Sequence, residues 1–251
     1  MKEENIVTVT MFGKFTISYQ GKKISERVAP VENQSWRMLK YILVNAGRGI
    51  TMEELAQELS AEGEEAAVAN NLRVRLSRMR DILGDLGLGS VKNGLILFGD
   101  GQFWVNGDYQ IVTDRDKIDW CYVSMADQKT PREGKLGEYI DGLACFNGIF
   151  LENSRNSFWI GKARAHYDKV YLQLLDFCME AMAETGDYSR ADVVLNGALR
   201  LKPWELDVHD RLLRGLLKQN RIAEAATYYA KLAVLFANTE LRLPEFNYFM
   251  N

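Results

Sequence analysis

The sequence of 251 residues is poor in cysteine, proline and histidine, and it lacks a long apolar run. Its three cysteines lie far apart, so the sequence predicts neither a disulfide framework nor a paired-cysteine metal site. Four prolines leave little room for a long linker. No segment approaches the roughly 20 uninterrupted apolar residues that cross a bilayer. The polar N-terminus also lacks a signal peptide, so we expect a soluble cytoplasmic protein with no membrane partner.

The residue combinations that support catalysis are also missing. His166 and His209 are the only histidines, and no cysteine has a histidine or second cysteine beside it. These side chains therefore form no recognisable nucleophile or metal site. The glycine-rich stretch at 84–89 is not followed by the Lys-Ser/Thr pair of a phosphate loop. We expect no enzyme, no metal and no cofactor, and we expect His209 and Cys178 to pack in the core.

An excess of basic charge is absent too, because 31 Lys and Arg stand against 34 Asp and Glu. Over the whole chain, this balance argues against nucleic acid as a partner. The distribution differs from the total: residues 53–65 contain six acids and no base, and residues 66–80 contain four arginines and no acid. A local basic surface is therefore possible. The alternative is a solvated helix whose arginines pair with neighbouring glutamates.

The N-terminal part shows a recognisable order of patterns. Period-two alternation in the first 25 residues predicts short strands. Helical spacing follows from Trp36, and Thr51, with a glutamate three residues later, has the spacing of a capping box that begins a second helix. A third helix is predicted over about 65–83, and a β-hairpin over 95–105. Strands, three helices and a terminal hairpin are typical of a winged helix-turn-helix.

The third helix has two distinct faces. At 100° per residue, four apolar side chains form one buried stripe: Leu72, Leu76, Met79 and Leu83. The opposite and flanking positions carry the side chains that we predict to contact DNA: Asn70, Asn71, Arg73, Val74, Ser77 and Arg78. Arginine can pair with guanine, asparagine with adenine, and valine can contact a thymine methyl group. Arg80 lies nearer the core boundary, where it could reach a phosphate or pair with a glutamate. The alternative is a polar face in contact with water only.

Beyond residue 113 the pattern is helical almost to the end, which predicts two domains, 1–113 and 114–251. The stretch 170–240 contains a repeat with a period of 34 residues. It aligns Gly186-Asp187-Tyr188 with Asn220-Arg221-Ile222, Ala191 with Ala225, Leu195 with Tyr229, and Ala198 with Leu232. This spacing is tetratricopeptide-like. The predicted fold class is therefore mainly α with small β-sheets: an N-terminal winged helix-turn-helix followed by an all-α helical repeat domain.

In such repeats, the first helix of each unit lines a concave groove. The residues expected there are mostly acidic, and they suggest a groove for a basic peptide or partner helix: Asp176, Glu180, Asp207 and Asp210, with Arg214 beside them. The alternative is a charged helix face that is only solvated.

Two stretches of the chain resemble known bacterial domains. The first 113 residues resemble the OmpR/PhoB-type winged-helix domain, with the recognition-helix pattern Asn70-Asn71-Leu72-Arg73-Val74-Arg75-Leu76-Ser77-Arg78-Met79-Arg80. The later part resembles the bacterial transcriptional activator domain in four segments: Phe150-Leu151-Glu152, Gly186-Asp187-Tyr188, Ala198-Leu199-Arg200-Leu201-Lys202-Pro203 and Leu241-Arg242-Leu243-Pro244-Glu245. Together they are similar to the antibiotic-regulatory-protein (SARP) class of transcriptional regulators.

This resemblance implies a sequence-specific activator that binds promoter repeats in double-stranded DNA as a homodimer and contacts RNA polymerase. The acidic loop with Glu62 and Glu64 matches a loop that can touch the polymerase in such domains. The hairpin departs from the family pattern, because Asp100 stands where a basic residue is common. The alternative function is an adaptor that does not bind DNA and uses the helical repeats for protein interactions. The sequence assigns no small-molecule ligand.

Overall fold

The computed structural model describes residues 5–27, 32–59, 65–126, 135–155, 157–237 and 239–250. The chain forms two compact units. The first comprises Met1–Thr113 together with Phe150–Lys162, and the second comprises Asp114–Ile149 together with Ala163–Asn251. The boundary between functional domains at residue 113 stays a prediction.

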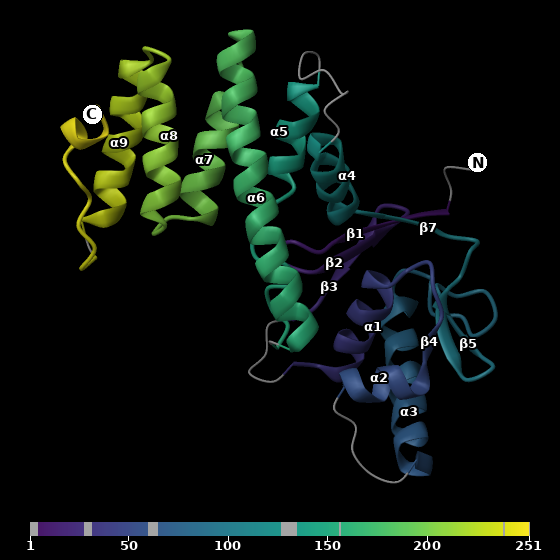
Figure 1. The fold of residues 1–251 in the computed structure, drawn as a ribbon. Helices are drawn as coiled ribbons and strands as arrows, with labels where there is room; N and C mark the ends of the chain where they lie inside the picture. The colour runs from purple at the N-terminus through teal and green to yellow at the C-terminus, as the bar shows by residue number, and fades with distance from the viewer. Residues whose placement is uncertain are drawn as a thin grey trace. The chain divides into compact units, whose positions relative to one another are not determined.

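The first unit contains a four-stranded sheet of order β3-β2-β1-β7 (Figure 1). Its strands are β1 (Ile6–Thr10), β2 (Thr16–Tyr19), β3 (Lys22–Ser25) and β7 (Gln110–Thr113). β1 runs antiparallel to β2 and parallel to β7, with Val9 opposite Ile17 and Thr113. Val7, Val9 and Ile17 are fully buried, as expected when alternate side chains of a strand face the core. The short strands predicted for the first 25 residues are thus confirmed, whereas β7 was not predicted.

Three helices and a second sheet complete the winged helix-turn-helix. They are α1 (Gln34–Val44), β4 (Ile50–Thr51), α2 (Met52–Glu58), α3 (Glu65–Gly84), β5 (Ile96–Gly99) and β6 (Gln102–Val105). The Asn33 side chain accepts hydrogen bonds from the first amides of α1, and Thr51 Oγ1 accepts one from the Glu54 amide at 3.1 Å. Because these side chains satisfy amides without helical partners, they fix where α1 and α2 begin. The predicted cap at Thr51 is confirmed.

The β5–β6 hairpin turns at Asp100 and Gly101, where the φ angles are 47° and 73°. Two left-handed residues are typical of a type I′ two-residue hairpin turn, whose twist matches that of the strands. β4 pairs with β6, so the second sheet has the order β4-β6-β5. The hairpin is confirmed. The two-residue strand β4 is too short to show a periodic pattern in the sequence.

A segment from the middle of the chain, Phe150–Lys162, returns to the first unit. Phe150 forms a bridge with Phe12 at the edge of the β1–β2 connection, and their ring centroids lie 5.4 Å apart. The Leu151 amide donates to the Met11 carbonyl at 2.7 Å. The buried Lys40 ammonium of α1 donates to Ser154 Oγ at 2.8 Å. The compact core of the first unit therefore includes side chains from a segment that the domain prediction placed elsewhere.

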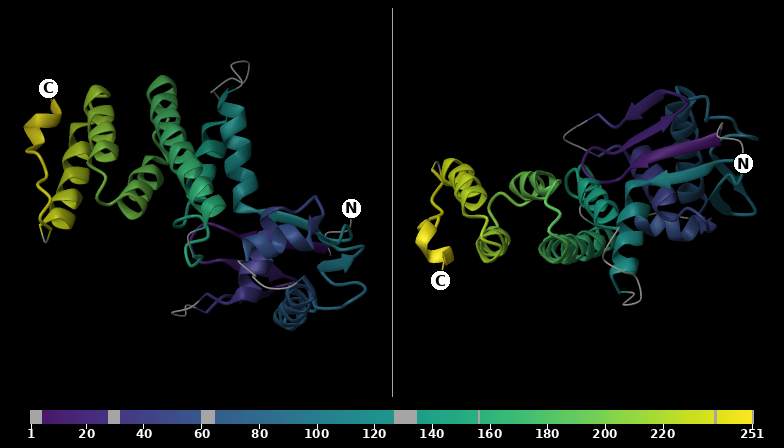
Figure 2. Two further views of the ribbon diagram at one scale, coloured as in Figure 1. Left: turned by 60° about the horizontal axis from the view of Figure 1, so that its bottom comes forward. Right: turned by 90° about the horizontal axis from the view of Figure 1, so that it is seen from above.

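The second unit is helical (Figure 2). Its helices are α4 (Asp114–Ala126), α5 (Leu136–Ala144), α6 (Phe158–Thr185), α7 (Ala191–Leu201), α8 (Leu206–Lys218) and α9 (Ile222–Phe236), with the short 3₁₀ helix η2 (Phe246–Met250). The first residues of α6 belong to the first unit. From α6 to α9, consecutive helices lie side by side in chain order. The predicted fold class, mainly α with small sheets at the N-terminal end, is confirmed.

The repeat seen in the sequence corresponds to a repeated helix ending. Gly186 and Asn220 follow α6 and α8, and both adopt left-handed conformations with φ of 68° and 57°. A residue of this conformation ends a helix and turns the chain back. Ala191 and Ala225 are buried at equivalent places in α7 and α9, so small side chains allow the paired helices to approach. His209 and Cys178 are fully buried, which confirms their predicted packing roles.

Candidate nucleic-acid interface

Helix α3 is held in the first unit by one apolar stripe. Leu72, Leu76, Met79 and Leu83 are all buried, and none is more than 4% exposed. Helix α3 packs against α1 and α2 in the first unit. The buried face predicted from helical spacing is therefore confirmed, and it determines which face of α3 remains outside.

The outer face of α3 carries the polar side chains predicted to contact DNA. Asn70, Asn71, Arg73, Val74, Ser77 and Arg78 are all exposed, and Val74 is 43% exposed although it is apolar. In the part of the chain that the structure describes, Arg73 and Arg78 make no ion pair. Their positive charges are therefore available to an incoming anion. Whether these six side chains contact DNA stays a prediction.

Arg80 differs from Arg73 and Arg78 because it lies partly under the protein surface. Burial lowers the pKa of its guanidinium, and Arg80 Nε is buried without a hydrogen-bond partner among the described residues. Arg75 is also half-buried and donates to Gln34 Oε1 of α1 at 3.5 Å. Both arginines thus lie at the core boundary. The structure shows no glutamate paired with Arg80 within its described ranges, and a phosphate contact by Arg80 stays a prediction.

Helix α2, which precedes the candidate recognition helix, is fixed to α1 by two polar contacts. Arg37 Nη2 lies 2.9 Å from Glu58 Oε1 in a largely buried ion pair at the end of α2. The Tyr41 hydroxyl donates to Glu54 Oε1 at 2.7 Å, and Glu54 also accepts from Arg48. Burial, followed by the hydrogen bond to Glu54, raises the pKa of Tyr41 to about 12. Both ends of α2 are therefore held by charged or polar partners, which fixes α2 against α1.

The hairpin that forms the wing carries no basic residue between Ile96 and Val105. Its tip consists of Gly99, Asp100 and Gly101, and Asp100 is exposed. A carboxylate at this position would repel a nearby phosphate. The electrostatics of the first unit therefore favour contact through α3 rather than through the wing.

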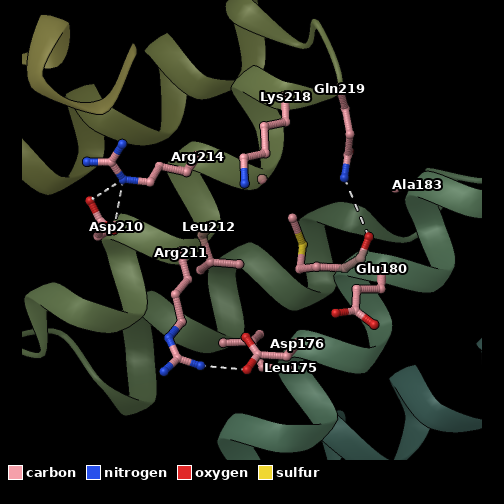
Figure 3. A pocket seen from close by; sticks show the side chains of 12 residues that line it. Leu175, Asp176, Glu180, Ala183, Asp210, Arg211, Leu212, Arg214, Lys218 and Gln219 are labelled. Carbon is pink, nitrogen blue, oxygen red and sulfur yellow. Dashed lines mark hydrogen bonds and ion pairs between the residues drawn. The ribbon is translucent and has the colours of Figure 1, made fainter. Parts of the chain in front are cut away.

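The groove prediction for the second unit is wrong in its charge. A hollow of about 490 Å³ lies between α6 and α8 (Figure 3), and Asp176, Glu180 and Asp210 line it, but Asp207 is not among its lining residues. Three bases line the hollow as well: Arg211, Arg214 and Lys218. Arg211 pairs with Asp176 at 2.5 Å, and Arg214 pairs with Asp210 at 2.9 Å. Arg214 was expected beside the acids, but Arg211 and Lys218 were not, although each lies three or four positions from Arg214 and so shares a face of α8 with it.

Two acidic residues predicted to touch a partner, Glu62 and Glu64, lie outside the described residues.

Burial raises the pKa of the Cys121 thiol to about 11 and that of Cys178 to about 12, so both thiols stay protonated at neutral pH. Within the described ranges, no group of three His, Cys, Asp or Glu side chains is arranged to hold a metal ion. Over those same residues, no helix has the length and apolar character needed to span a membrane.

Residues 124–241 match the family model of the bacterial transcriptional activator domain. This part of the chain is therefore similar to a bacterial transcriptional activator domain. The predicted resemblance to SARP-type regulators is thereby confirmed, and the matched family is one of transcriptional regulators rather than enzymes. This match includes residues 150–162, which pack in the first unit.

Among solved structures, the chain is similar to Mycobacterium tuberculosis EmbR, determined in complex with a low-affinity phosphopeptide. The two are 14% identical with a TM-score of 0.58, and the match covers 98% of this chain. It covers 64% of the EmbR chain, so this chain spans less than two thirds of that structure. At this identity the similarity shows a shared fold only. A comparison with curated protein sequences found no match.

Proposed function

We propose that this chain is a sequence-specific regulator that binds double-stranded DNA and activates transcription. The observation that carries the proposal is the outer face of α3. It presents exposed amide side chains and arginines that make no ion pair among the described residues, from a helix anchored by its opposite apolar stripe. A bacterial transcriptional activator domain in the same chain supports this reading. The proposed site of action is the cytoplasm, where bacterial promoter DNA is found.

The side chains of α3 suit the edges of bases in a major groove. Arg73 and Arg78 can each form two parallel hydrogen bonds with guanine, and Asn70 and Asn71 can do so with adenine. The exposed Val74 suits a thymine methyl group, which would explain an apolar side chain on an otherwise polar face. Ser77 can donate to a phosphate or a base. These contacts would specify the DNA sequence. Arg80 would contribute only to the position of the protein on the duplex and to its affinity for DNA.

The test is selection of bound sequences from a random pool of double-stranded DNA with the full chain, followed by mobility-shift titration of the selected site. The variant Arg73→Ala with Arg78→Ala should lose about 1–3 kcal/mol of binding free energy for each base contact removed. The matched control is Lys22→Ala with Lys23→Ala, which removes the same charge from exposed positions of β3. Equal loss in both variants would show a general charge effect, and unchanged affinity in the α3 variant would falsify the recognition-helix assignment.

An adaptor that does not bind DNA is the second candidate function. The observations that favour it are the acidic wing tip at Asp100 and the net charge of −3. The same mobility-shift experiment separates the two functions, because an adaptor would not retard genomic fragments even at low salt. Retardation that weakens as salt increases would support the DNA-binding function.

We further propose that the regulator works as a homodimer on promoter repeats and contacts RNA polymerase. The support is the resemblance to SARP-type regulators, in which the loop matching residues 60–65 can touch the polymerase. Reversing both charges, with Glu62→Lys and Glu64→Lys, should weaken capture of purified RNA polymerase by the DNA-bound protein. Promoter affinity should be unchanged or higher in this variant, so a loss of DNA binding would contradict the assigned role of the loop.

A further inference from the structure

The second unit has two hollows that share one wall. The first is the 490 Å³ hollow between α6 and α8, and the second, of about 240 Å³, lies beside η2. Arg214 and Lys218 line both hollows, and they are one helical turn apart on α8. These two side chains therefore form a ridge between the hollows, which we call the basic ridge.

The floor of the first hollow is apolar. Leu175, Met179 and Leu212 line it, and Gly215 lies opposite Met179: a Cβ at Gly215 would lie 3.1 Å from Met179 Cε. The glycine thus keeps open a space that a larger side chain would fill. The Arg211–Asp176 ion pair joins α8 to α6 at the same hollow, as Figure 3 shows. A volume of this size lies in the range of ligand pockets and has room for a large apolar side chain.

The second hollow exposes apolar side chains to solvent. Leu217, Ile222, Phe249 and Met250 line it, and Ile222 and Met250 are 49% and 56% exposed. Clusters of exposed apolar side chains that line a concavity are typical of interaction sites. Phe249 is buried beneath them, so the base of this hollow is fixed by the packed 3₁₀ helix.

The charge on the basic ridge is not fully neutralised. Arg214 pairs with Asp210, but Lys218 is exposed and makes no ion pair among the residues that the structure describes. Figure 3 shows the Lys218 side chain extending toward the middle of the first hollow. The remaining acids, Asp176 and Glu180, lie on the opposite wall formed by α6. An anionic group held between the two hollows would therefore face Lys218 on α8.

We propose that this surface binds an acidic amphipathic segment of a partner protein. Two apolar side chains of the segment enter the two hollows, and a carboxylate between them pairs with Lys218. The partner is thus opposite in charge to the basic peptide that the sequence suggested. The proposal does not depend on DNA binding, because the surface lies wholly within the second unit.

The probe is a set of fluorescein-labelled 14-residue helical peptides, each with two leucines three, four or seven positions apart and glutamates between them. A matched set has lysine in place of glutamate. Binding to the full chain is measured by fluorescence anisotropy. For one of the leucine spacings, the glutamate peptide should bind at least tenfold more tightly than the lysine peptide. Equal binding of the two sets, or no binding by any peptide, would overturn the proposal.

Two variants test the ridge and the hollow separately. Lys218→Glu should reverse the preference, so that the lysine peptide binds better than the glutamate peptide. Lys169→Glu is the matched control, because Lys169 is exposed on α6 and lines neither hollow. Gly215→Leu should fill the first hollow and weaken the binding of every peptide by at least tenfold. The circular dichroism spectrum of this variant should be unchanged. Identical peptide preferences in Lys218→Glu and Lys169→Glu would refute the role of the ridge.

Discussion

Lys40 is a buried base whose charge is balanced by buried acids in the first unit. Its ammonium lies 2.5 Å from Glu26 Oε2 and 3.5 Å from Glu32 Oε1, and its side chain is 1% exposed. Lys40→Met would leave two buried carboxylates without their cation, so we expect a loss of about 3–5 kcal/mol in the free energy of unfolding. Urea denaturation followed by tryptophan fluorescence measures this change.

The control for Lys40 is an ion pair on the surface. Arg48 pairs with Glu54, but its side chain is 48% exposed. Arg48→Met should therefore cost at most about 1 kcal/mol, because solvent screens the pair. Equal losses in the two variants would contradict the argument that burial makes the Lys40 cluster important.

His209 should make stability depend on pH. The Pro203 carbonyl, 3.3 Å from Nε2, can only accept, so Nε2 donates to it and Nδ1 accepts from the Tyr228 hydroxyl at 2.9 Å. Burial lowers the pKa of His209 in the folded state, so the unfolded chain binds more protons at mildly acidic pH. The free energy of unfolding should therefore fall as the pH decreases below about 6.5. Above that value, the stabilisation that comes from the neutral His209 side chain should be complete.

The comparison for His209 uses a side chain that does not titrate. His209→Gln and the wild type should be unfolded in urea at pH 7.5 and at pH 5.5. The wild type should lose more stability between these two conditions than the variant does, because only the wild type has the buried imidazole to protonate. Parallel losses would mean that other groups determine the pH dependence.

At the scale of elements, the segment that returns to the first unit should stabilise the β1–β2 connection. Phe150→Ala removes a ring that packs against Phe12, and such a truncation in a core costs about 3–5 kcal/mol. Hydrogen exchange should become faster in β1 and β2, whereas α8 and α9 keep their protection. Phe158→Ala is the control, since Phe158 is 89% exposed. Faster exchange in α8 instead would place Phe150 in the other folding unit.

The elements differ in how well the sequence predicted them, for physical reasons. Helix α3 was predicted with its buried and exposed faces because Leu72, Leu76 and Met79 repeat with the period of the helix itself. The parallel pairing of β1 with β7 joins residues about a hundred positions apart, and no local pattern encodes such a partner. The packing of Phe150–Lys162 in the first unit was not predicted for the same reason. The sequence predicted too acidic a groove between α6 and α8, because the pattern of acids alone does not show that Arg211 and Lys218 also face α6.

At the scale of the whole molecule, the net charge of −3 limits nonspecific attraction to DNA. The cationic side chains on the exposed face of α3 are Arg73 and Arg78, so each subunit should release few counterions from the phosphate backbone. The slope of the logarithm of affinity against the logarithm of salt concentration should therefore be shallow for one subunit on one site. For the proposed DNA-binding function, we therefore predict that tight promoter binding requires two subunits.

This requirement predicts a dependence on the spacing of the repeats. Two copies on one face of the duplex need sites whose centres are one helical turn apart, about 10–10.5 base pairs, or a multiple of it. A probe with two selected sites at a spacing of 10 or 11 base pairs should shift at a much lower protein concentration than a single-site probe. A spacing of 15 or 16 base pairs places the second site on the opposite face and should lose this advantage. If both spacings bind alike and no better than one site, each subunit binds independently, and the proposed homodimer on promoter repeats is wrong.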